Sequence, residues 1–137
     1  MHLRIEWLGR VPYREAWELQ REIVAARGGG KARGGGKAPD TLLLLEHEPV
    51  LTLGRHAEAR HVRASDQELS SRGIEVIRVE RGGEVTYHGP GQLMAYPIVH
   101  LRERGILLRP FVRVLEAAMA DVAAAYGVEA QARQGYP

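Results

Sequence analysis

Cysteine is absent from this sequence of 137 residues, and lysine is nearly so. A chain without cysteine cannot form a disulfide framework, a thiolate metal site or a cysteine nucleophile from its own residues. Among the 19 basic residues only Lys31 and Lys37 are lysines, and 17 acidic residues nearly balance them. The resulting formal charge of +2 does not indicate a nucleic-acid partner.

Long hydrophobic stretches are also missing. No apolar run approaches the roughly 20 residues that a membrane-spanning helix needs. Residues 1–6 lack the basic region and apolar core of a signal peptide. We therefore expect no membrane contact and a cytoplasmic protein. With 45% hydrophobic and 26% charged residues, the composition is ordinary for one globular domain, predicted to cover residues 1–137.

The first part of the chain predicts a strand and a helix around a flexible insertion. Residues 3–8 alternate as a strand should, and Gly9 is expected to end it. Pro12 suits the first turn of a helix over residues 13–27. The sequence Arg-Gly-Gly-Gly-Lys-Ala then occurs twice in succession. Six glycines with no apolar side chain to bury cannot offset the entropy of ordering them, so residues 28–39 are predicted to be a flexible glycine-rich insertion.

The remaining pattern predicts mostly strands. Ser65 and Glu68 form a capping-box signature for a short helix over residues 64–72. A longer helix over residues 109–126 carries an apolar stripe with Phe111 and Met119, which are expected in the core. Strands are predicted at residues 41–45, 50–53, 74–79, 93–101 and 128–131. The expected order, β-α-β-β-α-β-β-β-α-β, favours an α+β fold with a mixed sheet.

The segment from Arg81 to Gln92 is chemically the richest. Two glycines directly after a strand allow the backbone to approach a ligand closely. Arg81 adds a cation with up to five donors. Thr86, Tyr87 and His88 add hydroxyl and imidazole groups. From these residues alone, a decorated hairpin turn is an equally good interpretation.

Two stretches carry a family resemblance. Residues 81–93 read Arg-Gly-Gly-x-x-Thr-Tyr-His-Gly-Pro-Gly-Gln-Leu, followed by Tyr96-Pro97. Residues 46–55 contain Glu-His-x-Pro-Val-x-Thr-x-Gly-Arg. Both closely resemble the signatures of lipoyl(octanoyl) transferases, the lipoate-protein ligase B family, over its N-terminal two-thirds.

This resemblance implies a function. The family moves an octanoyl group from acyl carrier protein to a lysine of an apo lipoyl domain, through a thioester on its own cysteine. It uses no metal and no cofactor, because a thioester donor is already activated. Its fold is related to that of lipoate and biotin ligases. The substrate-binding stretch of the family falls on Arg81, Gly82, Gly83, Glu84, Val85, Thr86, Tyr87 and His88.

One departure from the family limits the expected activity. The family's catalytic lysine and cysteine lie beyond a strand that should start near Tyr136. Lys31 and Lys37 lie in the glycine repeat and match neither, so no catalytic residue is assigned in this chain. The chain by itself is expected to be inactive and to self-associate through an uncovered apolar sheet face or edge. An ATP-dependent lipoate or biotin ligase and a non-catalytic acyl-binding module remain the alternatives.

Overall fold

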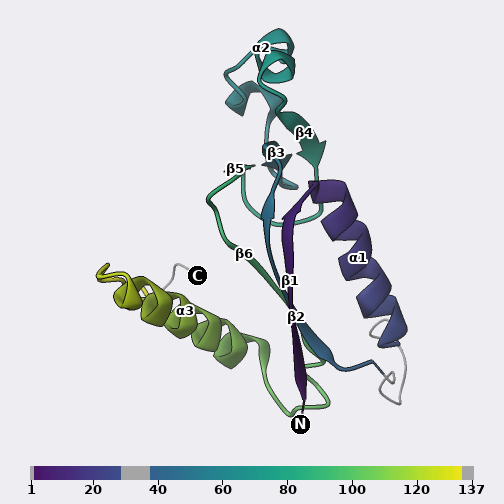
Figure 1. Cartoon of the computed structure of the whole chain (residues 1–137), viewed down its shortest axis with the longest axis vertical. Coiled ribbons are helices and arrows are strands. Elements are labelled where there is room, and N and C mark those ends of the chain that lie inside the picture. The colour runs from purple at the N-terminus through teal and green to yellow at the C-terminus, as the bar shows by residue number, and fades with distance from the viewer. Residues whose placement is uncertain (1, 29–37, 134–137) are drawn as a thin grey trace. The chain divides into compact units, whose positions relative to one another are not determined.

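The computed structural model describes residues 2–28 and 38–133 (Figure 1). Most of the predicted insertion and the strand expected near Tyr136 lie outside these residues, so both remain predictions. The chain divides into two units, residues 1–99 and 100–137. Each unit is described by itself.

The first unit contains two three-stranded sheets. In one sheet the order is β1-β2-β6, with β1 parallel and β6 antiparallel to β2. In the other it is β4-β3-β5, with β4 parallel and β5 antiparallel to β3. Mixed sheets with helices confirm the α+β class. The elements are β1 (Leu3–Val11), α1 (Tyr13–Ala26), β2 (Asp40–His47), β3 (Val50–Leu53), a 3-10 turn (Ala59–His61), α2 (Asp66–Ser71), β4 (Glu75–Arg78), β5 (Val85–His88) and β6 (Met94–Ile98).

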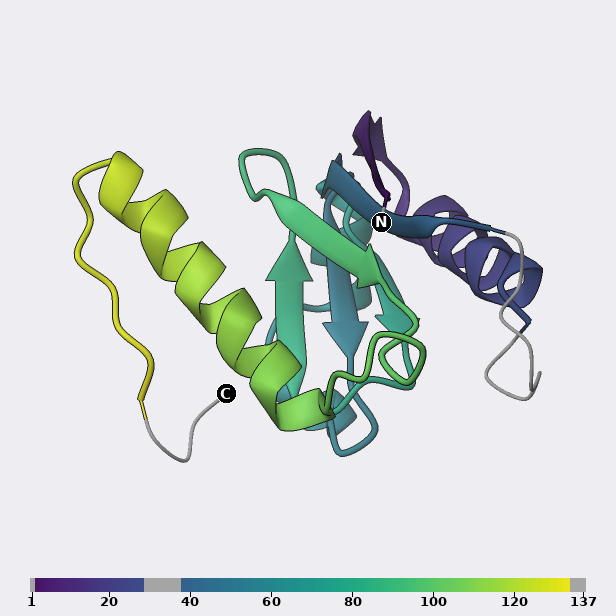
Figure 2. The ribbon, with the colours of Figure 1, turned by 90° about the horizontal axis from the view of Figure 1, so that it is seen from below.

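Helix α1 contributes to both cores of this unit. Ala16 is fully buried against Leu43 and Leu45 of β2, and Figure 2 shows α1 alongside the strands. The small side chain of Ala16 lets the helix approach the sheet closely. Tyr13, in the first turn of α1, and Trp17, one turn after it, pack against the second core around Val50, Ile77 and Val79. The start of α1 therefore lies where the two sheets meet.

The base of the predicted insertion is fixed by a buried ion pair. The guanidinium of Arg27 pairs with Asp40, and both side chains are less than 10% exposed. Arg27 Nη1 also donates a hydrogen bond to the carbonyl oxygen of Ala38 at 3.0 Å. These contacts hold the end of α1 beside the start of β2, on either side of the glycine repeat.

Strand β1 differs from the prediction. It does not end at Gly9 but continues to Val11. The parallel register with β2 shifts between Trp7 and Arg10, and Gly9 adopts φ +70°. This is a bulge that absorbs the extra residue, and glycine adopts such a backbone conformation at little cost.

The second unit is built on α3 (Leu108–Ala125). The helix ends at Gly127, as predicted, where a φ of +77° lets Val128 N donate to the carbonyl oxygen of Ala123 at 3.0 Å. No residue of α3 is buried, and Met119 is 65% exposed. The expectation that Met119 lies in the core is therefore wrong, because its stripe has no apolar layer against it within this unit.

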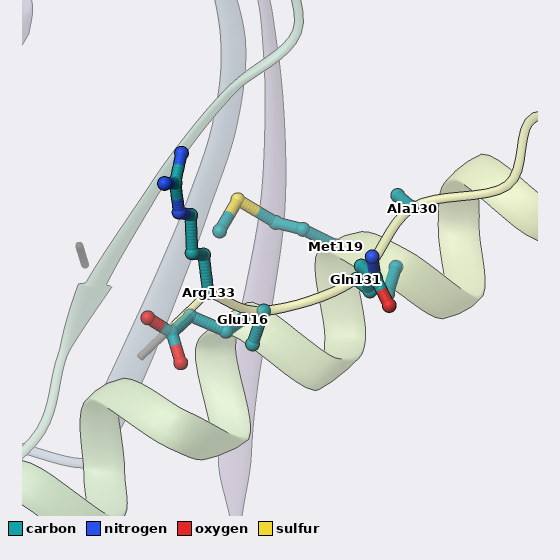
Figure 3. A pocket seen from close by; sticks show the side chains of 7 residues that line it. Glu116, Met119, Ala130, Gln131 and Arg133 are labelled. Carbon is teal, nitrogen blue, oxygen red and sulfur yellow. The ribbon is translucent and has the colours of Figure 1, made fainter. Parts of the chain in front are cut away.

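The segment after α3 also differs from the prediction. Residues 128–131 form no strand, since no neighbouring strand pairs with them among the described residues. The chain instead runs beside α3 and encloses with it a cavity of about 320 Å³. Figure 3 shows Glu116 and Met119 of α3 facing the segment that carries Gln131 and Arg133. Among residues 2–28 and 38–133, no helix combines the length and the hydrophobicity needed to cross a bilayer.

Candidate functional site

The side chain of Arg81 joins the β4–β5 loop to β3 through hydrogen bonds. Its Nη2 donates to the carbonyl oxygen and to Oγ1 of Thr52, both at 2.7 Å, and its Nε donates to the same Oγ1 at 3.2 Å. Further bonds reach the carbonyl oxygens of Gly82 at 2.8 Å and Glu84 at 3.1 Å. Most donors of this guanidinium therefore bind the protein's own backbone and Thr52, and they shape the loop.

The loop after Arg81 crosses Gly54 at very close range. A Cβ added at Gly54 would collide with the carbonyl oxygen of Gly83, and the Gly82 carbonyl oxygen would lie at 3.0 Å. Gly54 N donates to the carbonyl oxygen of Glu84 at 3.1 Å, and Arg55 N donates to that of Arg81 at 3.0 Å. Gly54 was not among the predicted site residues, although it belongs to the motif at residues 46–55.

The two loop glycines have different roles. Gly83 has φ +81°, which L side chains rarely adopt. Gly82 has no atom within 4 Å of an added Cβ. The sequence alone attributed both glycines to close approach by a ligand. The structure shows that the backbone conformation requires glycine at position 83, whereas only Gly82 leaves open space for a bound group.

Strand β5 divides its residues between two faces. Thr86 and His88 alternate onto the face of Thr52, and Thr86 is the register partner of Thr52. His88 Nε2 lies 3.4 Å from Thr52 Oγ1, and its Nδ1 lies 2.6 Å from Oε1 of Gln92. Tyr87 points the other way and is 49% exposed. Arg81, Thr86 and His88 therefore converge on Thr52, which was quoted in the motif but not predicted as a site residue.

An aromatic cluster lies beneath His88. The rings of Tyr13 and His88 are stacked, with centroids 6.3 Å apart and planes inclined by 15°. His47 lies 4.9 Å from Tyr13 and 6.0 Å from His88. His47 is fully buried. Its Nδ1 lies 3.0 Å from the carbonyl oxygen of Val11, and its Nε2 lies 2.8 Å from the hydroxyl of Tyr96.

Burial disfavours the charged forms of His47, Tyr13 and Tyr96. Burial is the main cause that lowers the pKa of His47, and the nearby His88 lowers it further, while the bond to Val11 opposes them. Burial also raises the pKa of Tyr96, and raises that of Tyr13 against the opposing effect of Arg81. Because the Val11 carbonyl can only accept, Nδ1 of the neutral His47 carries the proton and Nε2 accepts from Tyr96.

The two sequence motifs meet in space. Strand β3 from the first motif pairs with β5 from the second. Glu46 Oε2 accepts a hydrogen bond from Gly91 N at 2.8 Å. On the exposed side, Glu84 Oε2 lies 2.9 Å from Nδ1 of His61. None of the eight predicted site residues lines the α3 cavity or the hollow of about 590 Å³ between α1 and the end of β6.

Metal binding has no support in the described residues. Within residues 2–28 and 38–133, no three His, Cys, Asp or Glu side chains are grouped so that they could hold a metal ion. His61, which precedes α2 in an exposed loop, is instead paired with Glu84.

Comparison with known proteins identifies the family. Residues 12–136 match the model of the lipoyl protein ligase A/B catalytic domain. The chain is 47% identical to an octanoyltransferase of Chloroflexus aurantiacus, over 92% of this chain and 54% of the relative. It is 49% identical to an octanoyltransferase of Acidobacterium capsulatum, over 96% of this chain and 54% of the relative.

The chain thus spans about half the length of the curated relatives it matches, less than the expected two-thirds. Among solved structures it is similar to lipoate-protein ligase A bound with ATP. That likeness has a TM-score of 0.63 at 14% identity and covers 100% of this chain and 53% of the other, so it shows the fold alone. The chain belongs to the lipoyl protein ligase A/B catalytic domain family.

Proposed function

We propose that the protein to which this chain belongs is an octanoyltransferase of lipoate biosynthesis. The observation that carries the proposal is the meeting of the two motifs at Thr52, in a chain 47% identical to an octanoyltransferase over 92% of its length. The acyl donor is octanoyl-acyl carrier protein and the acceptor is a lysine of an apo lipoyl domain. A thioester donor is already activated, so the reaction needs neither ATP nor another cofactor.

The reaction has two steps. A cysteine thiolate attacks the thioester carbonyl of the donor, forms an enzyme thioester and releases the carrier thiol. The lysine amine of the lipoyl domain then attacks this thioester, forms an amide and returns the cysteine thiol. These 137 residues contain no cysteine, so the nucleophile of this proposal is supplied by a residue outside them.

The substrate-binding stretch of this proposal is Arg81 to His88. Gly82, Gly83 and Glu84 form its exposed loop, and Arg81 holds that loop from beneath through Thr52. The open space at Gly82 leaves room for an acyl chain. Each buried CH₂ of that chain is worth about 0.8 kcal/mol, so even partial cover by this loop contributes to binding.

A fusion tests the function. Residues 1–137 are joined to the C-terminal part of the Chloroflexus aurantiacus octanoyltransferase, beginning where the similarity ends. With octanoyl-acyl carrier protein and an apo lipoyl domain, we expect the mass of one octanoyl group on the lipoyl domain without ATP. The 137-residue chain alone is expected to form no covalent octanoyl adduct, since it has no cysteine. Intact mass spectrometry measures both.

The alternative function is an ATP-dependent lipoate ligase. We consider it because the chain is similar in fold to a lipoate-protein ligase bound with ATP. Lipoylation by the fusion from free lipoate only when ATP is present would favour the ligase. Acyl binding without transfer under either condition would favour a non-catalytic binding module. Thermal shift with octanoate, with and without ATP, separates these outcomes at the level of binding.

A point variant tests the site. Gly82→Val adds a side chain where no protein atom lies within 4 Å, so the fold is expected to tolerate it. If the acyl chain passes this point, the octanoyl Kd of the fusion rises by about tenfold, or roughly 1.4 kcal/mol. An unchanged Kd in a folded Gly82→Val protein means that the loop does not contact the acyl group.

A further inference from the structure

The hydroxyl of Thr52 already accepts hydrogen bonds from Arg81, which leaves its own proton to be donated. Thr52 is fully buried in the middle of β3. A hydroxyl has two acceptor lone pairs and one proton to donate. Arg81 donates to this oxygen twice, from Nη2 at 2.7 Å and from Nε at 3.2 Å. Both contacts come from the fork of one guanidinium, so the acceptor side of the hydroxyl faces Arg81 and its own proton points elsewhere.

Two acceptors compete for this proton. The carbonyl oxygen of Thr86 and Nε2 of His88 each lie 3.4 Å from Thr52 Oγ1. The other side of the imidazole decides whether Nε2 can accept. His88 Nδ1 lies 2.6 Å from Oε1 of Gln92, which is an acceptor, so the proton of the neutral ring is on Nδ1. Nε2 is then bare, and the Thr52 proton has two acceptors within reach, Nε2 and the Thr86 carbonyl oxygen.

The opposite tautomer, with the proton on Nε2, makes poorer contacts with Thr52 and Gln92. An Nε2–H would point at a Thr52 oxygen whose lone pairs already accept from Arg81. A bare Nδ1 would face the oxygen of Gln92 at 2.6 Å. The ring plane is held as well, because Tyr13 stacks on it at an inclination of 15°.

We propose that Thr52, whose acceptor side is occupied by Arg81, is a positioning residue that holds His88 in the Nδ1–H tautomer together with Gln92 on the other side of the ring. The proposal deepens the proposed function and rests on it for its role in acyl transfer. Gln92 is exposed, so its amide oxygen can be replaced by another acceptor. A thioester carbonyl oxygen is such an acceptor, and a preoriented N–H donor stabilises the charge that develops on it during attack.

Nuclear magnetic resonance tests the tautomer directly, without acyl transfer. The 137-residue chain, labelled with ¹⁵N-histidine, is measured at alkaline pH, where imidazoles are neutral. Long-range ¹H–¹⁵N spectra distinguish protonated from bare ring nitrogens. We expect His88 with a protonated Nδ1 and a bare Nε2. A protonated Nε2 in the parent protein overturns the proposal, whether or not any variant folds.

Variants then test Thr52. Thr52→Val keeps the branched shape and removes the donor to Nε2, while Gln92 still faces Nδ1. The share of the Nε2–H tautomer of His88 is therefore expected to rise. Thr52→Ser restores the hydroxyl and the parent spectrum. Thr41→Val is the matched control, because Thr41 is also buried but donates to the Pro39 carbonyl oxygen at 3.2 Å. If Thr52→Val leaves the His88 spectrum unchanged, Thr52 does not set the tautomer and the proposal fails.

Kinetics in the fusion connect the tautomer to function. Thr52→Val is expected to lower kcat for octanoyl transfer at least about tenfold, with little change in KM, and Thr52→Ser to recover most of it. Unchanged kcat with an altered tautomer means that His88 does not act on the reacting carbonyl, and the proposed role fails. An inactive parent fusion with the expected tautomer instead refutes the proposed function and leaves the Thr52–His88 arrangement standing.

Discussion

Gly54 shows how one residue without a side chain can decide the shape of the site. It is the next-to-last residue of the motif at residues 46–55, and its missing Cβ leaves the space occupied by the Gly83 carbonyl. Neither neighbour is a flexible side chain, so the backbone at Gly54 or in the loop that carries Gly82 and Gly83 must shift to admit a methyl group. The requirement for glycine comes from the fold, since no positive φ is involved at this position.

We therefore expect Gly54→Ala to destabilise the protein by about 1–3 kcal/mol, the usual cost of overpacking. Gly82→Ala, in the loop that crosses Gly54, is the matched control, because an added Cβ there meets nothing within 4 Å. Chemical denaturation of both variants measures the difference. Equal free energies of unfolding for the two would show that the approach at Gly54 is not tight.

His47 gives a pH dependence whose sign follows from its burial. Its pKa in the folded state lies below the ordinary 6.5, mainly because burial disfavours the charged ring. The unfolded state thus binds a proton first as the pH falls. The contribution of neutral His47 to stability is complete above the unfolded pKa and is lost as the pH falls below it towards the folded pKa.

Melting temperature against pH tests this. As the pH falls from about 8 to about 5, the melting temperature of the parent is expected to drop, and most of the drop comes around and below the ordinary histidine pKa. His47→Gln should melt lower at neutral pH, since it disturbs the bonds to Val11 and Tyr96, and should show a flatter profile in this window. A variant profile parallel to that of the parent would assign the dependence to other groups.

At the scale of single elements, α2 shows that a short helix can be specified locally. Ser65 Oγ accepts from Glu68 N at 3.3 Å, and the Glu68 carboxylate accepts from Ser65 N at 2.8 Å. The bond from Ser65 N lowers the pKa of the Glu68 carboxyl, and a second bond to it from Ser65 Oγ at 2.8 Å lowers that pKa further. The helix is only six residues long, so its cap supplies a large share of the bonds that hold it.

Ser65→Ala is expected to cost about 1 kcal/mol of stability, as loss of an N-cap usually does. Ser70→Ala in the exposed part of the same helix is the control, and alanine there is a slightly better helix former. Thermal unfolding of the two variants measures the difference. If Ser65→Ala unfolds at the same temperature as Ser70→Ala, the capping box does not contribute.

Helices were predicted better than strands, for a physical reason. The helix over residues 13–27 and the capping box at Ser65 depend on spacing within one turn. The continuation of β1 through Gly9 depends instead on a register shift against β2, more than 30 residues away in the sequence. Residues 128–131 have a strand-like composition but no pairing strand among the described residues, so the local pattern was insufficient.

At the largest scale, that of the whole first unit, one apolar sheet face is uncovered within that unit. Leu3, Ile5 and Trp7 alternate along β1 and are 50%, 60% and 60% exposed. Leu42 and Leu44, the register partners of Ile5 and Trp7, lie on the same face. β1 is also an edge strand of its sheet, and an exposed apolar edge strand favours association.

We therefore expect the 137-residue chain to self-associate at micromolar concentration, which sedimentation velocity measures. Ile5→Lys should reduce association, because a charged side chain on this face disfavours apolar contact. Gln67→Lys, on the exposed surface of α2, adds the same single positive charge elsewhere and controls for the change in net charge. A monomeric parent, or equal effects of the two variants, would contradict a role for the β1 face.

The sequence by itself determined the class of the protein and the chemistry available to it. The two motifs indicated the protein family, and the composition showed that no cysteine is present. Local spacing determined the helices, their caps and the presence of most strands, since these depend on periodicity and on backbone preferences within a few residues.

Only the tertiary structure decided how the site residues act. The pairing of β3 with β5 brings Thr52 to Arg81 and His88, so that an arginine expected to face a ligand instead shapes the loop and orients a hydroxyl. The same pairing places Gly54 beneath Gly83. Hydrogen-bond partners some 30 residues apart depend on strand register, and local sequence preferences do not specify that register.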